Sequence, residues 1–427
     1  MPGDFIIDRS DLASVKFLVV GDTGEGDESQ FAVVPPLLER GSDTQFMIIC
    51  SDVVYPDGDV NEYLGKFYVP YKDYPEPIYA LPGNHDWYDG LNGFMAHFCG
   101  GEPSERSLGS NRILRLLWRR AARAVPAVIE RCRTLRPEPE RRLKQPGPYF
   151  AIDTGPLRIV AIDTGISGQL DREQGEWLLR VSGSSRKPKI LLTGKPLYVD
   201  NEYHPGSIDG STTMVDDVVR ANEHNYVAII GGDIHNYQRY PVEVGSRTIQ
   251  YIVSGGGGAY MSDTHRIPRV DVKGVDEEDF RCYPLRGDSL SAYSRIVDRR
   301  FFLGLGLFFI PPGEAAVLMA ERLGIDPSRL TDRHEKPRRR KRVVSRLPFL
   351  RTPRRNGGRR FLEPYFYPFF SEVFDWDEPP LFKNFLRLET TEDRLLITCY
   401  GVTGCAEHEA NPPVEDRIEI PLVHPES

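Results

Sequence analysis

The sequence predicts an α/β fold around a largely parallel sheet, and three observations lead to that prediction. Short apolar runs rich in β-branched and aromatic residues recur, and each ends in a cluster of Gly, Asp, Asn or His. The first clusters contain Asp22, Asp52 and Asn84, which lie 30 and 32 residues apart, a spacing that suits strand, crossover and strand. The 427 residues are 40% apolar and 27% charged, as in globular proteins, and no apolar run approaches the ~18 residues of a membrane span.

The predicted strands can be followed in order along the chain. They are expected at 15–24, 45–55, 76–86, 147–153, 157–164, 189–199, 226–242 and 248–260. The two strands within 147–164 have the form of an antiparallel hairpin, and 168–182 has the pattern of a helix. Because parallel sheets place ligands at the C-terminal ends of their strands, we expect the polar clusters to meet on one rim.

These units predict a core domain over residues 11–260 with two additions. Residues 106–145 carry apolar positions at helical spacing among arginines, which predicts a helical, basic insertion within that domain. Residues 261–360 are predicted to form a second insertion, first helical and then basic. Residues 361–427 are predicted to supply C-terminal strands that close the core, including two strands within 384–403.

The net charge of −8 conceals an uneven distribution of charge. Residues 336–360 hold twelve Lys and Arg and no acid, and residues 112–145 hold eleven basic and three acidic residues. Such segments bind nucleic acid by releasing counterions, and the apolar run at 301–313 adds contact with an anionic membrane surface as an alternative. A solvated loop has the same composition, so all three interpretations stay open.

The cysteines and the N-terminus point to a compartment. Six cysteines without a CxxC pair indicate unpaired thiols in a reducing environment. The first eleven residues contain three aspartates, and no basic stretch followed by an apolar one is present there. We therefore expect a cytoplasmic protein.

Four motifs, each after a predicted strand, carry oxygen, amide and imidazole groups. A single Asp or Asn after a strand is usually a turn former or a helix cap. The ordered set is more specific: GDTG at 21–24, SDVVY at 51–55, GNHD at 83–86 and GGDIHNYQ at 231–238. Together these motifs resemble the calcineurin-like metallophosphoesterase family, in particular its purple acid phosphatase-like branch, with motifs GDxG, GDxxY, GNH and GHxH.

The resemblance implies a four-layer αββα metallophosphoesterase sandwich, here with helical and basic insertions, around two metal ions. It implies hydrolysis of a phosphomonoester or phosphodiester by attack of a metal-bound hydroxide. Residue by residue, it makes Asp22, Tyr55 and His235 ligands of the first ion, Asp52 a bridge between the ions, Asn84 a ligand of the second ion, and His85 the catalytic imidazole. The ions would be Fe, Mn or Zn, and a phenolate ligand such as Tyr55 favours iron at the first position.

These assignments agree with general chemistry. A carboxylate with two oxygens can bridge two ions, which then clamp the attacking and leaving oxygens of a displacement at phosphorus. The neutral amide of Asn84 adds an oxygen ligand without adding a charge that would repel phosphate. Because histidine titrates near neutral pH, His85 can protonate a leaving oxygen or stabilise the phosphate.

Two departures from the family pattern affect the second ion. Gly194 stands where the family has a histidine ligand, and Asp233 replaces the first histidine of GHxH. Asp233 is still a competent ligand and favours a harder ion such as Mn²⁺ over Zn²⁺. His204 is a possible replacement ligand or an ordinary surface histidine, and Lys195 is a possible phosphate contact or a solvated lysine.

The altered second position leaves different functions open. The first is a metal-dependent phosphoesterase acting on a phosphorylated small molecule. The second is a degenerate member of the family that binds a phosphorylated ligand, nucleic acid or a membrane surface without turnover. In a third, the basic segments dominate, and the protein is associated with nucleic acid or membrane.

Overall fold

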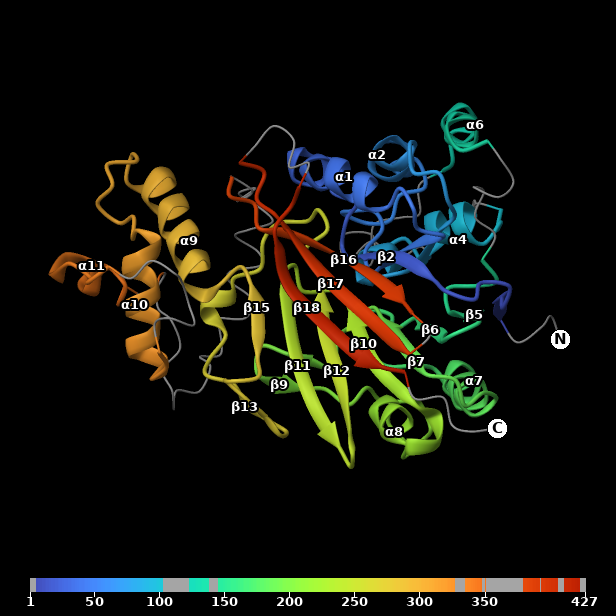
Figure 1. Cartoon of the computed structure of the whole chain (residues 1–427). Coiled ribbons are helices and arrows are strands. Elements are labelled where there is room, and N and C mark those ends of the chain that lie inside the picture. The colour runs from blue at the N-terminus through green and yellow to red at the C-terminus, as the bar shows by residue number, and fades with distance from the viewer. Residues whose placement is uncertain are drawn as a thin grey trace.

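Two mixed sheets face each other in the computed structural model (Figure 1). The structure describes residues 5–102, 123–137, 145–326, 335–347, 350, 379–391, 393–405 and 411–422. Much of the basic segments 112–145 and 336–360 lies outside these residues, and so does all of 361–378.

The larger sheet has eight strands. Their spatial order is β1 (Ile6–Arg9), β5 (Phe150–Thr154), β6 (Arg158–Ile162), β7 (Lys189–Thr193), β10 (Tyr226–Gly231), β12 (Arg247–Ser254), β11 (Tyr237–Val244) and β15 (Arg281–Tyr283). Strands β6, β7, β10 and β12 are parallel, and β5 and β6 form the predicted hairpin. The strand predicted over 226–242 is in fact two strands, β10 and β11, on either side of the motif that contains Asp233 and His235.

The smaller sheet has six strands and joins distant parts of the chain. Its order is β18 (Val414–Pro421), β17 (Arg394–Val402), β16 (Lys383–Thr390), β2 (Lys16–Val20), β3 (Phe46–Cys50) and β4 (Ile78–Leu81). Strands β2, β3 and β4 are parallel, as their spacing predicted, and β16 runs antiparallel to β2. Two further strand pairs are short: β8 (Tyr198–Val199) with β9 (Glu202–Tyr203), and β13 (Asp271–Val272) with β14 (Val275–Asp276).

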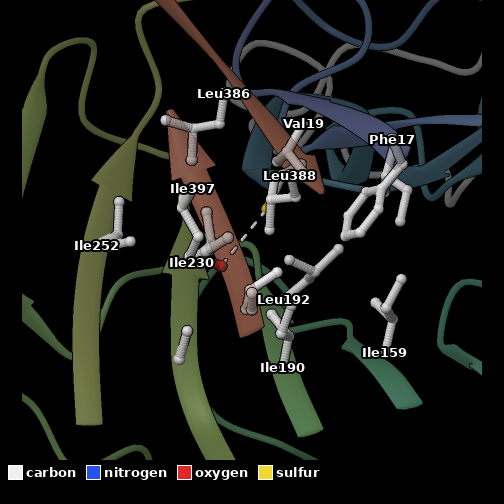
Figure 2. Close-up of a cluster of buried hydrophobic side chains, with 14 of the residues drawn as sticks. Phe17, Val19, Ile159, Ile190, Leu192, Ile230, Ile252, Leu386, Leu388 and Ile397 are labelled. Carbon is white, nitrogen blue, oxygen red and sulfur yellow. Dashed lines mark hydrogen bonds between the residues drawn. The ribbon is translucent and has the colours of Figure 1, made fainter. Parts of the chain in front are cut away.

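Successive side chains of a strand point to opposite faces of its sheet, and in central strands such as β2 both faces are buried. Phe17 and Val19 of β2 point into the apolar core between the sheets, where they meet Ile190 and Leu192 of β7 (Figure 2). Their neighbour Leu18 points to the opposite face and packs beneath helices. A strand buried on both sides needs apolar residues at consecutive positions, which is the pattern of the predicted runs.

Helices cover the outer faces of the two sheets. On the smaller sheet lie α1 (Glu28–Arg40), η1 (Leu64–Tyr68), α2 (Val69–Tyr71) and α4 (Asn92–Phe98), and on the larger sheet lie α7 (Arg172–Gly183) and α8 (Val215–Arg220). Asp27 caps α1 by accepting hydrogen bonds from the backbone of Ser29 and Gln30. The layers are therefore helix, sheet, sheet and helix, which confirms the predicted αββα sandwich. Four further helices are α3 (Asn84–Trp87), α6 (Pro126–Leu135), η2 (Asn222–His224) and η3 (Thr264–Arg266).

Three helices form a lobe beside the sandwich (Figure 1). They are α9 (Arg286–Phe301), α10 (Pro312–Leu323) and α11 (Arg339–Val344), and they enclose an apolar core of their own. Within the described ranges no helix combines the length and the hydrophobicity needed to cross a membrane. All six cysteines fall in those ranges and are unpaired, as predicted. The cytoplasmic location stays a prediction.

Candidate metal centre

The motif residues lie at the C-terminal ends of neighbouring strands, and their backbone is unusual. Asp22, Ser51, Asp52 and Asp233 all have positive φ, at 52°, 78°, 24° and 68°. Non-glycine residues adopt such angles at a cost of about 1–3 kcal/mol each, and the surrounding structure must hold them there. The backbone N–H of Asp22 donates to the carbonyl oxygen of Ser51 at 3.2 Å, and that of Asp233 donates to Asp22 Oδ2 at 2.9 Å.

Glycines allow the backbone to pack closely around Asp22. A Cβ atom at Gly232 would lie 2.7 Å from Asp22 Oδ2, and one at Gly255 would lie 2.5 Å from the same oxygen. The backbone of Gly257 donates to the carbonyl oxygen of Gly21 at 2.8 Å, and Ala259 donates to that of Asp22 at 2.9 Å. The four-glycine run at 255–258 is thus part of the support of the site. Its position directly after a strand was the sequence signal for it.

Two predicted ligands of the first ion, Asp22 and His235, and the predicted bridge Asp52 lie around the phenol oxygen of the third ligand, Tyr55. Tyr55 Oη lies 3.4 Å from Asp22 Oδ1, 3.1 Å from Asp52 Oδ2 and 3.1 Å from His235 Nε2. His235 Nδ1 donates to the carbonyl oxygen of Tyr260 at 2.8 Å, which leaves the lone pair of Nε2 on the side of Tyr55. All four side chains are almost completely buried.

A bound cation would stabilise the charged forms of the carboxylates in this group. Burial, with the nearby charges of Asp52 and Asp233, raises the pKa of Asp22 well above its usual range, and burial also raises the pKa of Asp52. Burial lowers the pKa of His235 to about 3, so its imidazole is neutral. Two buried carboxylates without a nearby cation are unfavourable, and a metal ion would compensate them.

The donor set fits a hard or borderline metal ion. Two carboxylates, a phenol and a neutral imidazole are suitable ligands for iron, manganese or zinc. Among the described residues, no group of three or more His, Cys, Asp and Glu side chains is arranged to hold a metal ion. The phenol of Tyr55 is the group that links the three other donors here, so the predicted first position depends on it.

His85 lies at the edge of this group with one ring nitrogen available. Its backbone N–H donates to Asp52 Oδ1 at 2.8 Å, and its Nδ1 donates to the carbonyl oxygen of Pro56 at 2.7 Å. Because a carbonyl only accepts, Nδ1 carries the proton and Nε2 remains for a proton or a ligand. The side chain is partly exposed.

The second predicted position contains a lysine contact. Lys195 Nζ lies 2.5 Å from Asp233 Oδ1. Asn84 begins α3, and its side-chain amide donates to Tyr88 Oη at 3.2 Å. His204 follows β9 with a 55% exposed side chain, 3.6 Å from Glu202. The ligand role of His204 and the phosphate contact of Lys195 therefore stay predictions.

One further carboxylate, that of Asp86, supports the site. Asp86 is fully buried, and its Oδ2 accepts hydrogen bonds from the backbone of Val53 at 2.9 Å and of Gly83 at 3.0 Å. Tyr63 Oη lies 3.3 Å from the other oxygen. Asp86 thus ties the SDVVY motif to the GNHD motif. The final Asp of GNHD was the available signal.

Comparisons with known proteins give the following matches. A model of the calcineurin-like phosphoesterase family matches residues 15–237, just over half of the chain. A purple acid phosphatase from yellow lupin (Lupinus luteus) seeds is 11% identical over 97% of this chain and 55% of its own, with a TM-score of 0.46. This chain thus spans about half the length of that phosphatase. No curated protein sequence matches.

Two other solved structures are similar to the chain. One is GAP50, described as the anchor in the inner membrane complex of Plasmodium, at 11% identity over 61% of this chain and 76% of that chain, with a TM-score of 0.40. The other is PhoD, at 10% identity over 94% of this chain and 68% of that chain, with a TM-score of 0.38.

Proposed function

Because the chain belongs to the calcineurin-like phosphoesterase family, we propose that it is a metal-dependent phosphoesterase that hydrolyses a phosphomonoester or a phosphodiester. The observation that supports this most is the group of buried donors around Tyr55 Oη: Asp22, Asp52 and His235. These donors suit Fe, Mn or Zn, and the phenol favours iron. A bound metal ion would lower the pKa of its water ligand, and the resulting hydroxide would be the nucleophile.

The residues around that position have separate tasks in this proposal. Asp52 connects them, because one of its oxygens accepts from Tyr55 and the other from the backbone of His85. The Pro56 carbonyl fixes the His85 ring through Nδ1, so Nε2 is oriented for the substrate. His85 would then hold a phosphoryl oxygen or protonate the leaving oxygen. The partly exposed position of His85 gives substrate access to it.

A second candidate is binding of a phosphorylated ligand without turnover. The contact of Lys195 with Asp233 favours it, because an ammonium lies against a residue that the family resemblance makes a ligand of the second ion. Such a protein would bind phosphate analogues and metal but would not hydrolyse esters.

The test uses p-nitrophenyl phosphate and bis-p-nitrophenyl phosphate with Mn²⁺, Fe²⁺ or Zn²⁺. We expect metal-dependent hydrolysis of at least one ester and a loss of about 10³-fold in Asp52→Asn. Asp43→Asn is the control, because Asp43 pairs with Lys16 and Arg387 at the surface. No hydrolysis with any ion, together with retained binding of a phosphate analogue, would establish the second candidate instead.

A further inference from the structure

Lys195 is held in place along its backbone and at its ammonium. Its backbone N–H donates to Thr164 Oγ1 at 3.0 Å, and its carbonyl oxygen accepts from Thr193 Oγ1 at 3.0 Å. The ammonium contacts Asp233 Oδ1 at 2.5 Å, and the two side chains are only 28% and 21% exposed. These contacts therefore fix Lys195 at the edge of the candidate metal centre.

The neighbouring glycine leaves little room for a histidine ligand. A Cβ atom at Gly194 would lie 2.8 Å from Thr164 Oγ1 and 3.3 Å from the carbonyl oxygen of Pro82. Thr164 would have to move to accept a side chain there, yet its hydroxyl also binds the backbone of Lys195. A side chain at position 194 would therefore displace the Thr164 hydroxyl that holds the backbone of Lys195.

Two of the predicted ligands on this side, Asp52 and Asp233, have polar partners in the structure. Asp52 accepts from Tyr55 and from the backbone of His85, one oxygen each. Asp233 accepts from Lys195, and one divalent ion plus one ammonium would balance the three carboxylates Asp22, Asp52 and Asp233. A second divalent ion beside the ammonium would meet strong repulsion in this partly buried setting.

We infer that the ammonium of Lys195 takes the place of a second metal ion, so that the chain binds one ion rather than two. This inference rests on the proposed function and deepens it. An ammonium has three N–H donors, and only one is needed for Asp233. The other two can bind a phosphoryl oxygen, which is the task a second ion would otherwise perform.

The test is the number of Mn²⁺ ions bound per chain, measured by equilibrium dialysis and by the electron paramagnetic resonance signal of Mn²⁺. We expect one ion per chain with an uncoupled signal in the wild type and in Lys195→Arg. Lys195→Met keeps the aliphatic stem but frees Asp233, so we expect a second, weaker ion there. Lys187→Met is the control, because Lys187 pairs with Asp153 at the opposite end of β7.

Two ions with a spin-coupled signal in the wild type would overturn the inference, and so would a single ion in Lys195→Met. Both results concern metal binding and not hydrolysis. An inactive protein that binds one ion would therefore overturn the proposed function and leave this inference standing.

A different observation concerns the loop between α9 and α10, which is ordered and yet presents apolar side chains to solvent. Both oxygens of Asp298 hold it, accepting from the backbone of Gly306 and of Phe308 at 2.7 Å each. Nevertheless Leu303 is 88% exposed and Leu305 is 66% exposed. Burying these two leucine side chains against another surface would be favourable in free energy, because it removes apolar area from water.

A basic helix is attached to the same loop. Lys341 of α11 donates through Nζ to the carbonyl oxygen of Gly306 at 3.1 Å. Arg339 and Arg340 in the first turn of α11 are exposed, and Val343 is 63% exposed. Figure 1 shows the loop and α11 on the side of the lobe away from the two sheets. The lobe thus combines exposed leucines and arginines.

We propose that this surface, formed by Leu303, Leu305, Val343, Arg339 and Arg340, binds an anionic phospholipid membrane. Leucine side chains would enter the boundary between headgroups and acyl chains, and arginines would bind the headgroup phosphates. The positive charge favours a lipid surface over an apolar protein partner, which would leave the arginines unpaired.

The test is sedimentation of the protein with phosphatidylcholine vesicles that contain or lack phosphatidylserine. We expect binding only with phosphatidylserine, and at least about a tenfold loss of binding in Leu303→Ser/Leu305→Ser. Leu179→Ser on α7 is the control, since Leu179 is 41% exposed on another face. Equal binding by the double variant, or binding to DNA with none to vesicles, would overturn this proposal.

Discussion

In the first half of the metal centre, buried donors from three strand ends surround one phenol oxygen, whereas in the second half a partly exposed carboxylate binds a lysine. In the first half the backbone of Gly232 and Gly255 packs so closely against Asp22 that neither position has room for a side chain. The second half lies nearer to solvent, where one charged group can replace another. The comparison teaches that close backbone packing fixes a ligand set, while partial exposure permits its chemistry to change.

The largest expected effect comes from breaking the first half. Asp22→Asn removes the charge of a buried ligand, and we expect about a 10³-fold loss of hydrolysis together with loss of the bound ion. Metal content and ester hydrolysis measured on the same preparation check this. Asp393→Asn, in an exposed turn with the side chain 73% exposed, should behave as the wild type. Retained metal in Asp22→Asn would contradict the assignment.

A smaller effect is expected where the two halves meet. His85→Gln removes the imidazole beside Asp52 but no predicted ligand, so we expect about a 10²-fold loss of hydrolysis with unchanged metal content. His204→Gln is the matched histidine control, and it also tests the predicted extra ligand. Unchanged hydrolysis in His85→Gln would contradict its catalytic role, whereas loss of metal in His204→Gln would support a ligand role for His204.

Acid should destabilise the fold at α4, the helix that carries His97 on the outer face of the smaller sheet. His97 binds the carbonyl oxygen of Val60 at 2.8 Å, and burial lowers its pKa from 6.5 to about 4. Between these two pH values His97 binds a proton in the unfolded chain but stays neutral in the folded chain. The free energy of unfolding therefore falls as the pH falls through this window. From pH 6.5 to 5 the loss is up to about 2 kcal/mol.

Comparison of urea unfolding at pH 7 and pH 5 measures this loss. The variant His97→Gln cannot titrate, so its loss of stability over the same range should be smaller by up to that amount. An equal loss in both proteins would show that other groups carry the pH dependence.

The smallest effect is expected in the second half. Asn84→Ala removes an amide that would matter only if a second ion were bound. We therefore expect less than about a threefold change in metal affinity and in hydrolysis. Titration with Mn²⁺ followed by the ester assay measures both. If Asn84→Ala lost as much metal binding and hydrolysis as Asp22→Asn, the second half would hold metal as the first half does, which contradicts the expected difference between them.

The sandwich was predictable because its strands are buried on both faces. Consecutive apolar residues such as Phe17, Leu18 and Val19 divide between two cores, and each strand ends in a polar motif. The ordered motifs also identified the residues around Tyr55. Nothing local, however, shows that Lys195 reaches Asp233, which is 38 residues away.

The sequence predicted a helical part within 261–360 but not the bounds of α9 (Arg286–Phe301), for a physical reason. Its buried face includes Ser289, Ser291 and Ser294, so an apolar periodicity is weak. Small residues serve there because α10 approaches closely: a Cβ atom at Gly287 would lie 2.9 Å from Ala316 Cα. The two helices pack through a close backbone approach instead of through large apolar side chains. A sequence pattern of apolar residues therefore does not indicate this helix.

The pairing of β2 with β16 has a consequence for the time course of synthesis. One edge of β2 pairs with β3 early, but its other edge waits for residues 383–390. At about 5–20 residues per second, ribosomes need roughly 20–70 s to reach them. The backbone of Asn384 also binds Gly256, in the glycine run behind Asp22. The nascent chain thus carries an open strand edge for that interval, and chaperone demand should peak before the hairpin emerges.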